Sequence, residues 1–299
     1  MSSLEQKIAA TPHRTAEQVL AHPSFAEARK LYVDGHMALY EGDARLNRLI
    51  LEAGRVMLFG YVVCLHAGYV EADRATWPTV SRLKEVLAPF QAASDRQMDD
   101  IIARLADRGF LQISPAPGDR RARLVIPTEV LYAHHRELLA ALFRPLQFMY
   151  PDPSYAAPTN RDPSYHKAHC AISLSALPWS AKFVAANAPV MLFFSRHSGI
   201  AILVKLIQMM NESGASSGLS YADIGLRFGV SRTHVRALLS EAESLGLTQL
   251  AGRGGRLVHL TPPLLAAFDR LFADSMAVLD LIHALTLSAR EPALQAAAV

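Results

Sequence analysis

The chain has 299 residues, of which 51% are hydrophobic and 19% are charged. This composition excludes a globally disordered protein, and the length suits one large domain or two of ordinary size. The net charge of +3 permits a nucleic-acid partner without demonstrating one, and a count of only two cysteines excludes a disulfide framework or a four-cysteine zinc site.

The beginning of the chain, Met1 to Lys7, is polar and lacks the apolar stretch of a signal peptide. The longest apolar run, Val56 to Leu65, is about half as long as a membrane-spanning helix needs to be. We therefore expect a cytoplasmic protein with reduced cysteines and no association with a membrane.

Two helices are predicted between positions 78 and 109. The first spans Pro78 to Phe90, and the turn after it contains no glycine. The second follows Ser94, a suitable N-cap, and stops at Gly109. Its apolar residues recur at helical spacing and form one stripe: Met98, Ile101, Ile102 and Leu105. The pattern predicts two packed amphipathic helices.

A β-hairpin is predicted directly after Gly109. Residues 110–113 have the pattern of a short strand, residues 114–119 are rich in turn formers, and residues 120–128 form the second strand. Another helix is expected to begin at Thr128, next to Pro127.

Prolines mark the middle of the chain. Five of them lie between positions 145 and 163, and they predict an extended connection because proline cannot continue a helix and restricts the residue before it. The sequence therefore divides into an N-terminal domain, residues 1–148, a linker, residues 149–164, and a C-terminal domain, residues 165–299.

Histidine and cysteine side chains follow this linker. His166, His169 and Cys170 could offer three metal-ligand groups on one helical face. No fourth ligand is evident from the sequence, and His134-His135 has even less support. We therefore expect the start of a helix with surface histidines, no metal site and no cofactor.

The pattern of helix, turn, helix and hairpin recurs in the second half. Residues 221–228 read as a helix and Gly229 as a turn, and residues 231–246 repeat the cap, the stripe and the stop at a constant offset of 137 positions. Two strands around a tip at residues 251–255 complete a second hairpin, and Thr261 begins the next helix. The repeat predicts a mainly helical protein with small hairpins and two winged helix-turn-helix domains.

The first copy resembles the MarR family of bacterial transcriptional regulators. In that family a recognition helix ending in Arg-Gly leads into a wing with an Asp-x-Arg-Ala signature, as residues 104–111 and 119–125 do here. The similarity covers roughly residues 79–128, whereas residues 220–261 resemble a generic bacterial winged helix. The resemblance implies a single-chain pseudo-dimer, monomeric or further dimerised, with a shared core of helices at residues 45–65, 129–142, 190–210 and 264–287.

The resemblance also implies double-stranded DNA as the partner. A recognition helix presents its N-terminal residues to base edges, and arginines at a wing suit the minor groove. In the second copy the candidates are Arg232, Thr233, His234 and Arg236 on the helix, with Arg253 and Arg256 on the wing. In the first copy they are Arg96 and Gln97 on the helix, with Arg120, Arg121 and Arg123 on the wing.

The first recognition helix departs from the family because it is acidic. Asp95, Asp99, Asp100 and Asp107 stand against three arginines, and carboxylates repel phosphate. We expect this helix to bind DNA poorly or to depend on its wing, where Asp119 could form a structural ion pair. The alternative for all these residues is a solvated helix face or a flexible hairpin.

A small aromatic effector is a further expectation from the resemblance. Its pocket would be lined by apolar and aromatic residues, for each of which ordinary packing is the favoured explanation: Met57, Phe59, Tyr61, Trp179, Phe193, Phe194, Met209 and Met210. No catalytic motif is present, so we expect no enzymatic activity and no catalytic residues.

These observations favour a sequence-specific transcriptional regulator tuned by a small ligand. Two other functions stay open. One is a plasmid replication initiator with tandem winged helices, which would bind repeated sites. The other is a sensor or protein-interaction module that has lost DNA binding, which the acidic helix favours.

Overall fold

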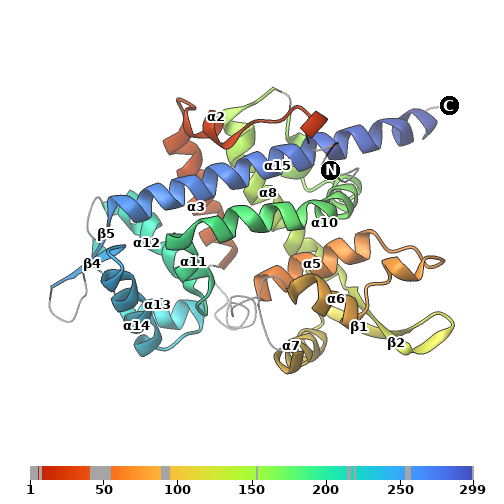
Figure 1. Cartoon of the computed structure of the whole chain (residues 1–299), viewed down its shortest axis with the longest axis horizontal. Coiled ribbons are helices and arrows are strands. Elements are labelled where there is room, and N and C mark those ends of the chain that lie inside the picture. Colours follow the sequence, from red (N-terminus) through yellow and green to blue (C-terminus); the bar gives the residue numbers. More distant parts are fainter. Residues whose placement is uncertain are drawn as a thin grey trace. The chain divides into compact units, whose positions relative to one another are not determined.

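The computed structural model describes residues 9–40, 55–88, 95–152, 154–213, 217–218, 220–252 and 257–297, together with Gln6 (Figure 1). Side chains are described except at residues 55–57, 176–185, 213, 217–218 and 291–297. Within these ranges the chain is mainly helical and has two small antiparallel sheets, which confirms the expected fold class at that level.

The chain forms two compact units, and each is built from segments far apart in sequence. Unit 1 contains Met1–Thr15, Met57–Ala181 and Met276–Val299; unit 2 contains Ala16–Val56 and Lys182–Ser275. The proline-rich stretch expected to separate two consecutive domains lies inside unit 1, where Tyr155 is fully buried. The compact units are therefore not the two consecutive halves of the chain.

Unit 1 contains the first helix pair and its hairpin. Its elements are α5 (Arg55–Ala67), η1 (Arg74–Thr76), α6 (Val80–Leu87), α7 (Asp95–Asp107), β1 (Leu111–Ala116), β2 (Asp119–Pro127), α8 (Glu129–Met149), α9 (Ala156–Thr159), most of α10 (Pro163–Ala186) and the end of α15 (Pro262–Ala297). The strands pair from Leu111 opposite Pro127 to Ala116 opposite Asp119. The turn therefore has two residues instead of the six expected. The strand register shifts after Pro115, which has no N–H to donate to the sheet.

Unit 2 contains the second helix pair. Its elements are α2 (Ala16–Leu20), α3 (Phe25–Tyr40), α11 (Ala188–Phe194), α12 (Gly199–Ser213), β3 (Ser217–Gly218), α13 (Tyr221–Phe228), α14 (Arg232–Ser244), β4 (Thr248–Ala251), β5 (Leu257–Leu260) and the beginning of α15. The three strands pair in the order β3-β5-β4. Arg253 and Arg256, at the tip expected between β4 and β5, lie outside the described residues.

The end of α7 is held by a set of hydrogen bonds around a glycine. Gly109 has a φ of +76°, a left-handed conformation that favours glycine. The Phe110 N–H donates to the Leu105 carbonyl at 2.9 Å, and the Thr128 hydroxyl donates to the Gly109 carbonyl at 2.6 Å. The hydroxyl therefore connects the end of the hairpin to the end of the helix.

The end of α14 carries the same set of hydrogen bonds. Gly246 has a φ of +70°, the Leu247 N–H donates to Ala242 at 2.9 Å, and the Thr261 hydroxyl donates to the Gly246 carbonyl at 2.8 Å. Each donor and acceptor lies at the position that the sequence repeat predicts. The repeat is therefore confirmed as a repeat of local structure.

Helices α3 and α10 resemble each other at their first residues. At the start of α3, the Ser24 N–H donates to the His22 ring at 3.1 Å; at the start of α10, the Ser164 N–H donates to the Asp162 carboxylate at 2.7 Å. Both sites have a Pro-Ser pair followed by an aromatic residue. The repeat therefore extends to α3 in unit 2 and to the first part of α10 in unit 1, although the sequence analysis had not found α3.

The expected continuous helix at residues 190–210 is wrong. The chain breaks after α11, and α12 continues at an angle of 115° to it. Ser198 adopts a φ of +55° at the break, and a Cβ on Gly199 would lie only 2.2 Å from the Phe193 carbonyl oxygen. The bend therefore depends on a glycine that lets one backbone segment approach another closely.

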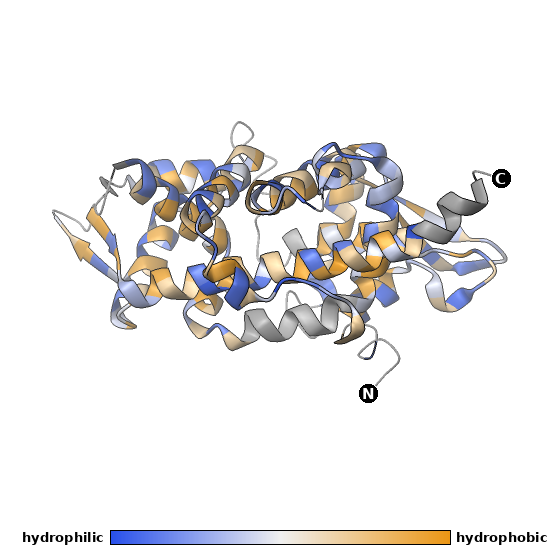
Figure 2. Cartoon of the chain, turned by 90° about the horizontal axis from the view of Figure 1, so that it is seen from above, coloured by the Kyte–Doolittle hydropathy of each residue, from blue (hydrophilic) through white to orange (hydrophobic). Residues whose placement is uncertain are grey.

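One described helix, Pro262–Arg290, is long and apolar enough to cross a membrane, and the bent pair α11 and α12 passes the same test as a broken span. In the single helix, however, 67% of the most apolar window is buried. Figure 2 shows hydrophobic and hydrophilic residues intermixed along the helices. Such burial is typical of a helix that packs in a protein core.

Candidate functional site

Helix α14 presents a polar, basic surface at its N-terminus. The Ser231 side chain caps the helix by accepting from the His234 N–H at 3.0 Å. Arg232, Thr233 and Arg236 are exposed, whereas Val235 is buried in the apolar stripe. Three of the four predicted contact residues on this helix therefore face solvent together.

His234 differs from its neighbours. Its ring is partly buried, and Nε2 lies 2.8 Å from the backbone carbonyl of His197. Arg196 from the same segment pairs with Glu241 of α14 at 2.6 Å. His234 therefore helps to hold α14 against the break between α11 and α12, a role that its sequence position did not indicate.

The turn before α14 is fixed by a close backbone approach. The Val230 N–H donates to the Gly225 carbonyl at 2.9 Å, and a Cβ on Gly225 would lie 2.6 Å from the Val230 oxygen. Gly229 supplies the left-handed residue that ends α13, with a φ of +71°. The two glycines together set the angle at which α14 leaves α13.

The corresponding helix in unit 1 has a mixed charge. Arg96 and Gln97 are exposed near the N-terminus of α7, as predicted, but so are Asp95 and Asp100. Asp99 is paired with Lys84 of α6 at 2.8 Å, which joins the two helices. The acidic face expected from the sequence is therefore confirmed, with one of its carboxylates engaged by a lysine.

The β1–β2 hairpin carries the other arginine cluster. Arg120, Arg121 and Arg123 are exposed on β2, and within the described part of the chain they form no ion pair. Asp119 pairs instead with Arg74 of η1, and it accepts from the Arg121 N–H at 3.0 Å. These three arginines are therefore exposed on the hairpin and form no ion pair with the described residues.

The Asp119 carboxylate is stabilised in its charged form. The hydrogen bond from the Arg121 N–H, followed by the contact with Arg74, lowers its pKa. Arg74 also lies over the Trp77 ring at 5.4 Å, and Trp77 is buried with Ala116 and Leu124. The ion pair that the sequence suggested for Asp119 is present, but its partner comes from outside the hairpin.

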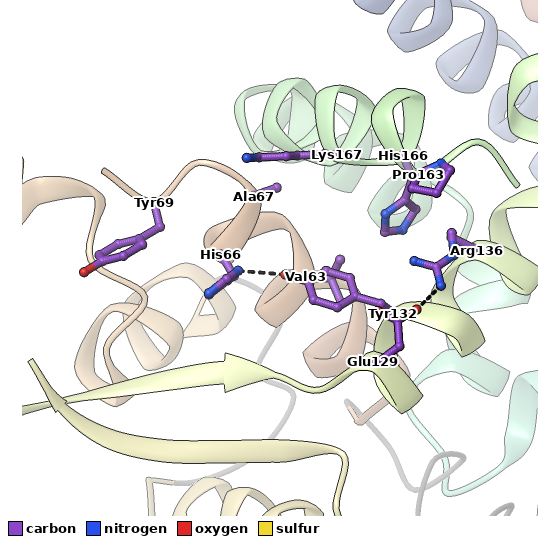
Figure 3. A pocket seen from close by; sticks show the side chains of 10 residues that line it. All are labelled: Val63, His66, Ala67, Tyr69, Glu129, Tyr132, Arg136, Pro163, His166 and Lys167. Carbon is purple, nitrogen blue, oxygen red and sulfur yellow. Dashed lines mark hydrogen bonds and ion pairs between the residues drawn. The ribbon is translucent and has the colours of Figure 1, made fainter. Parts of the chain in front are cut away.

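A cavity of about 340 Å³ opens beside the hairpin within unit 1 (Figure 3). It is lined by Val63, His66, Ala67, Tyr69, Glu129, Tyr132, Arg136, Pro163, His166 and Lys167. Arg136 pairs with Glu129, and the Tyr132 oxygen lies 2.7 Å from His66 Nδ1. The lining combines aromatic rings with two cationic side chains.

The residues predicted to line an effector pocket lie elsewhere. Phe59, Tyr61 and Phe193 are buried in the core, and none of the eight candidates lines this cavity. The side chains of Met57 and Trp179 are not among those that the structure describes. For the three buried aromatics, packing is the better explanation, while the cavity is lined by a different, mixed set of apolar, aromatic and charged residues.

The expectation of surface histidines on α10 is wrong. His166 and His169 are only 3% and 4% exposed, because α10 packs on other helices of unit 1. His166 Nε2 lies 2.7 Å from His135 Nδ1 of α8, and Cys170 Sγ lies within 4 Å of both nitrogens. His169 instead contacts Tyr165, at 3.4 Å from the phenol oxygen.

No family model, curated protein or solved structure matches this chain. The exposed arginines of α14 and β2 can bind anions or the polar edges of bases. The cavity in unit 1 can admit a small molecule.

Proposed function

We propose that this protein binds specific double-stranded DNA sequences and regulates transcription, as two winged helix-turn-helix domains in one chain. The observation that carries the proposal is the exposed Arg232, Thr233 and Arg236 surface at the N-terminus of α14. That helix follows a glycine turn and precedes a hairpin, which is the arrangement in which a recognition helix enters the major groove.

The duplicated local structure supports the same proposal for the first half. The hydrogen bonds around Gly109 match those around Gly246, so α7 occupies the place of a recognition helix and β1–β2 the place of its wing. Arg120, Arg121 and Arg123 then contact phosphates or the minor groove, and they compensate for the aspartates of α7.

The assignment of α3 and α10 supports a pseudo-dimer. Helix α3 precedes the first copy in sequence but belongs to the unit of the second copy, where Arg29 pairs with Asp269 at 2.6 Å. Most of α10 precedes the second copy but belongs to the unit of the first. Such a reciprocal exchange of N-terminal helices is expected where two related halves share a helical core.

The cavity of unit 1 is the effector site in this proposal. Tyr69 and Tyr132 offer aromatic surfaces, and Lys167 offers a positive charge in addition to the Arg136–Glu129 pair, so a small aromatic anion suits the lining. A ligand that binds one geometry of the two units better than another shifts the population toward that geometry.

The test is a pull-down of sheared genomic DNA from the source organism with the full chain. A transcriptional regulator returns a small set of promoter fragments, whereas a replication initiator returns repeats at plasmid origins. Enrichment of neither supports the protein-interaction module favoured by the acidic α7, and it would overturn the DNA-binding proposal.

The variant that tests the role of α14 combines Arg232→Ala with Arg236→Ala. Each arginine that pairs with a guanine contributes about 1–3 kcal/mol of discrimination, so we expect the double variant to lose specific enrichment. Arg161→Ala is the control, because Arg161 pairs with Glu137 outside both helix pairs and hairpins. Equal enrichment by the double variant and the control would remove α14 from the interface.

A further inference from the structure

Three potential metal-ligand atoms converge between two helices of unit 1. His135 Nδ1 comes from α8, and His166 Nε2 and Cys170 Sγ come from α10; all three atoms lie within 4.8 Å of one another. His166 and Cys170 are spaced by four residues, so they share one face of α10. This cluster is separate from the arginines of the proposed DNA interface.

A second thiol adjoins the cluster. Cys64 of α5 interacts with Cys170, and both cysteines are buried and free. Cys64 is not among the three converging residues, so its thiol must turn toward them to serve as the fourth ligand. The four residues come from three helices and lie up to 106 positions apart, which explains why no motif marks them.

The observed spacing is close to that of a tetrahedral zinc site. Zn–N bonds of about 2.0–2.1 Å and a Zn–S bond of about 2.3 Å place N and S ligand atoms about 3.6 Å apart and two nitrogens about 3.4 Å apart. Cys170 Sγ lies 3.7 Å from His166 Nε2 and 3.9 Å from His135 Nδ1. Among these three atoms, the two nitrogens, at 2.7 Å, must separate further.

The charges of the four ligands also suit a metal. Two thiolates would neutralise Zn²⁺, and the loaded site would then carry no net charge in its buried position. Binding releases the thiol protons to solvent.

One member of the cluster borders the cavity. His166 lines the cavity of unit 1 beside Tyr132 and Arg136 (Figure 3). The Nε2 atom of His135 faces Gly60 of α5, where a Cβ would lie 3.7 Å from it. The His135 ring is therefore held between α8 and α5, with Nδ1 directed to the cluster.

We propose that His135, His166, Cys170 and Cys64 bind one Zn²⁺ ion. Imidazole and thiolate ligands in tetrahedral geometry select zinc over magnesium or calcium, which prefer oxygen. The site connects α5, α8 and α10 within unit 1. It does not depend on the proposed DNA binding, because no residue of α14 or of the hairpins takes part.

The test is a Co²⁺ titration of the reduced, chelator-treated full chain, followed by competition with Zn²⁺. Cobalt reports tetrahedral geometry by its visible absorption and a sulfur ligand by its thiolate charge-transfer absorption. We expect one equivalent to bind with both signals and to be displaced by zinc. A folded protein that gives no thiolate signal overturns the proposal.

Variants identify the ligands. Cys170→Ser and His135→Gln are each expected to weaken metal binding by at least about 100-fold. Mutation of a residue that only hydrogen-bonds to a ligand already lowers metal affinity by about 10–100-fold. His134→Gln is the matched control, because His134 contacts Phe59 instead of the cluster. Unchanged affinity in His135→Gln would overturn the proposal.

A thermal measurement covers the case in which Cys170→Ser does not fold. Zinc is expected to raise the Tm of the wild type and of His134→Gln, since a ligand that binds only the folded state stabilises it. It should leave the Tm of His135→Gln unchanged. An equal rise in all three proteins contradicts the assignment.

Discussion

At the tip of the β1–β2 hairpin, the Asp119 carboxylate joins two parts of unit 1. It accepts from the Arg121 N–H at 3.0 Å and pairs with Arg74, which comes from η1. The first contact shapes the turn and the second ties the hairpin to the segment before α6. Both keep Arg121 and its neighbours in a fixed orientation.

Two substitutions of Asp119 distinguish the effects of these two contacts. Asp119→Ala is expected to speed amide hydrogen exchange at Arg121, because the N–H loses its acceptor. Asp119→Asn should restore protection there, since its amide oxygen still accepts while the ion pair with Arg74 is lost. Hydrogen exchange measured by mass spectrometry checks both results, and equal exchange in Asp119→Ala and the wild type would contradict this role.

His36 of α3 makes stability depend on pH. Its Nδ1 lies 3.1 Å from the Tyr32 carbonyl oxygen, and burial lowers its pKa from 6.5 to about 4. The unfolded chain therefore binds a proton at His36 more readily than the folded chain does. Stability from this residue is present above about pH 6.5 and is lost as the pH falls toward 4.

His36→Gln is expected to reduce the fall in Tm between pH 7 and pH 5, because glutamine does not titrate in this range. His13→Gln, a replacement outside α3, is the comparison for a general effect of removing a histidine. Thermal unfolding of the three proteins at both pH values checks the prediction. An identical fall in the wild type and His36→Gln would refute it.

At the scale of the elements, one threonine in each copy donates the same hydrogen bond. Thr128 and Thr261 begin α8 and α15, but their hydroxyls donate backwards, to the carbonyls of Gly109 and Gly246. Each hydroxyl therefore connects the C-terminal end of a helix, α7 or α14, to the end of the hairpin that follows that helix.

Thr128→Val and Thr261→Val are expected to cost similar amounts of stability, about 0.5–1.5 kcal/mol each, because valine keeps the shape and removes one hydrogen bond. Chemical denaturation of both variants measures this. A large cost at one position and none at the other would show that the two copies do not share this connection.

The sequence predicts most of what lies within one element or one turn. The stripe of Val235, Leu238 and Leu239 predicts α14, because helical periodicity is contained in the helix itself. Gly109 and Gly246 predict where helices end, because a left-handed residue favours glycine. The hairpins follow from strands on either side of turn-forming residues.

What depends on distant contacts could not be predicted. The break before α12 requires Gly199 to approach the Phe193 carbonyl, and a run of apolar residues gives no sign of that. His135 and His166 lie 31 positions apart in sequence, and only the packing of α8 against α10 brings them together. The exchange of α3 and α10 between the units has the same origin.

At the scale of the whole molecule, the two copies differ in charge. Helix α7 contains four aspartates and two arginines, whereas α14 has its two arginines in the first half and its two glutamates in the second. Of the latter, Glu241 is paired with Arg196. The proposed DNA contacts are therefore stronger in unit 2 than in unit 1.

An asymmetric DNA site follows from this difference. Selection from a random duplex library is expected to give one well-defined half-site, read by α14, and a poorly defined second half, since α7 offers fewer donors and repels phosphate. Alignment of the selected sequences measures the information in each half. A perfect palindrome would contradict the asymmetry between the copies.

The most direct test of DNA recognition through α14 is the affinity for the best selected duplex. Fluorescence anisotropy at fixed salt should show that Arg232→Ala with Arg236→Ala weakens binding by at least about 30-fold, since two base-reading arginines together contribute about 2 kcal/mol or more. Binding to a scrambled duplex should change much less. Equal affinity of the wild type and the double variant for the selected duplex would contradict recognition through α14.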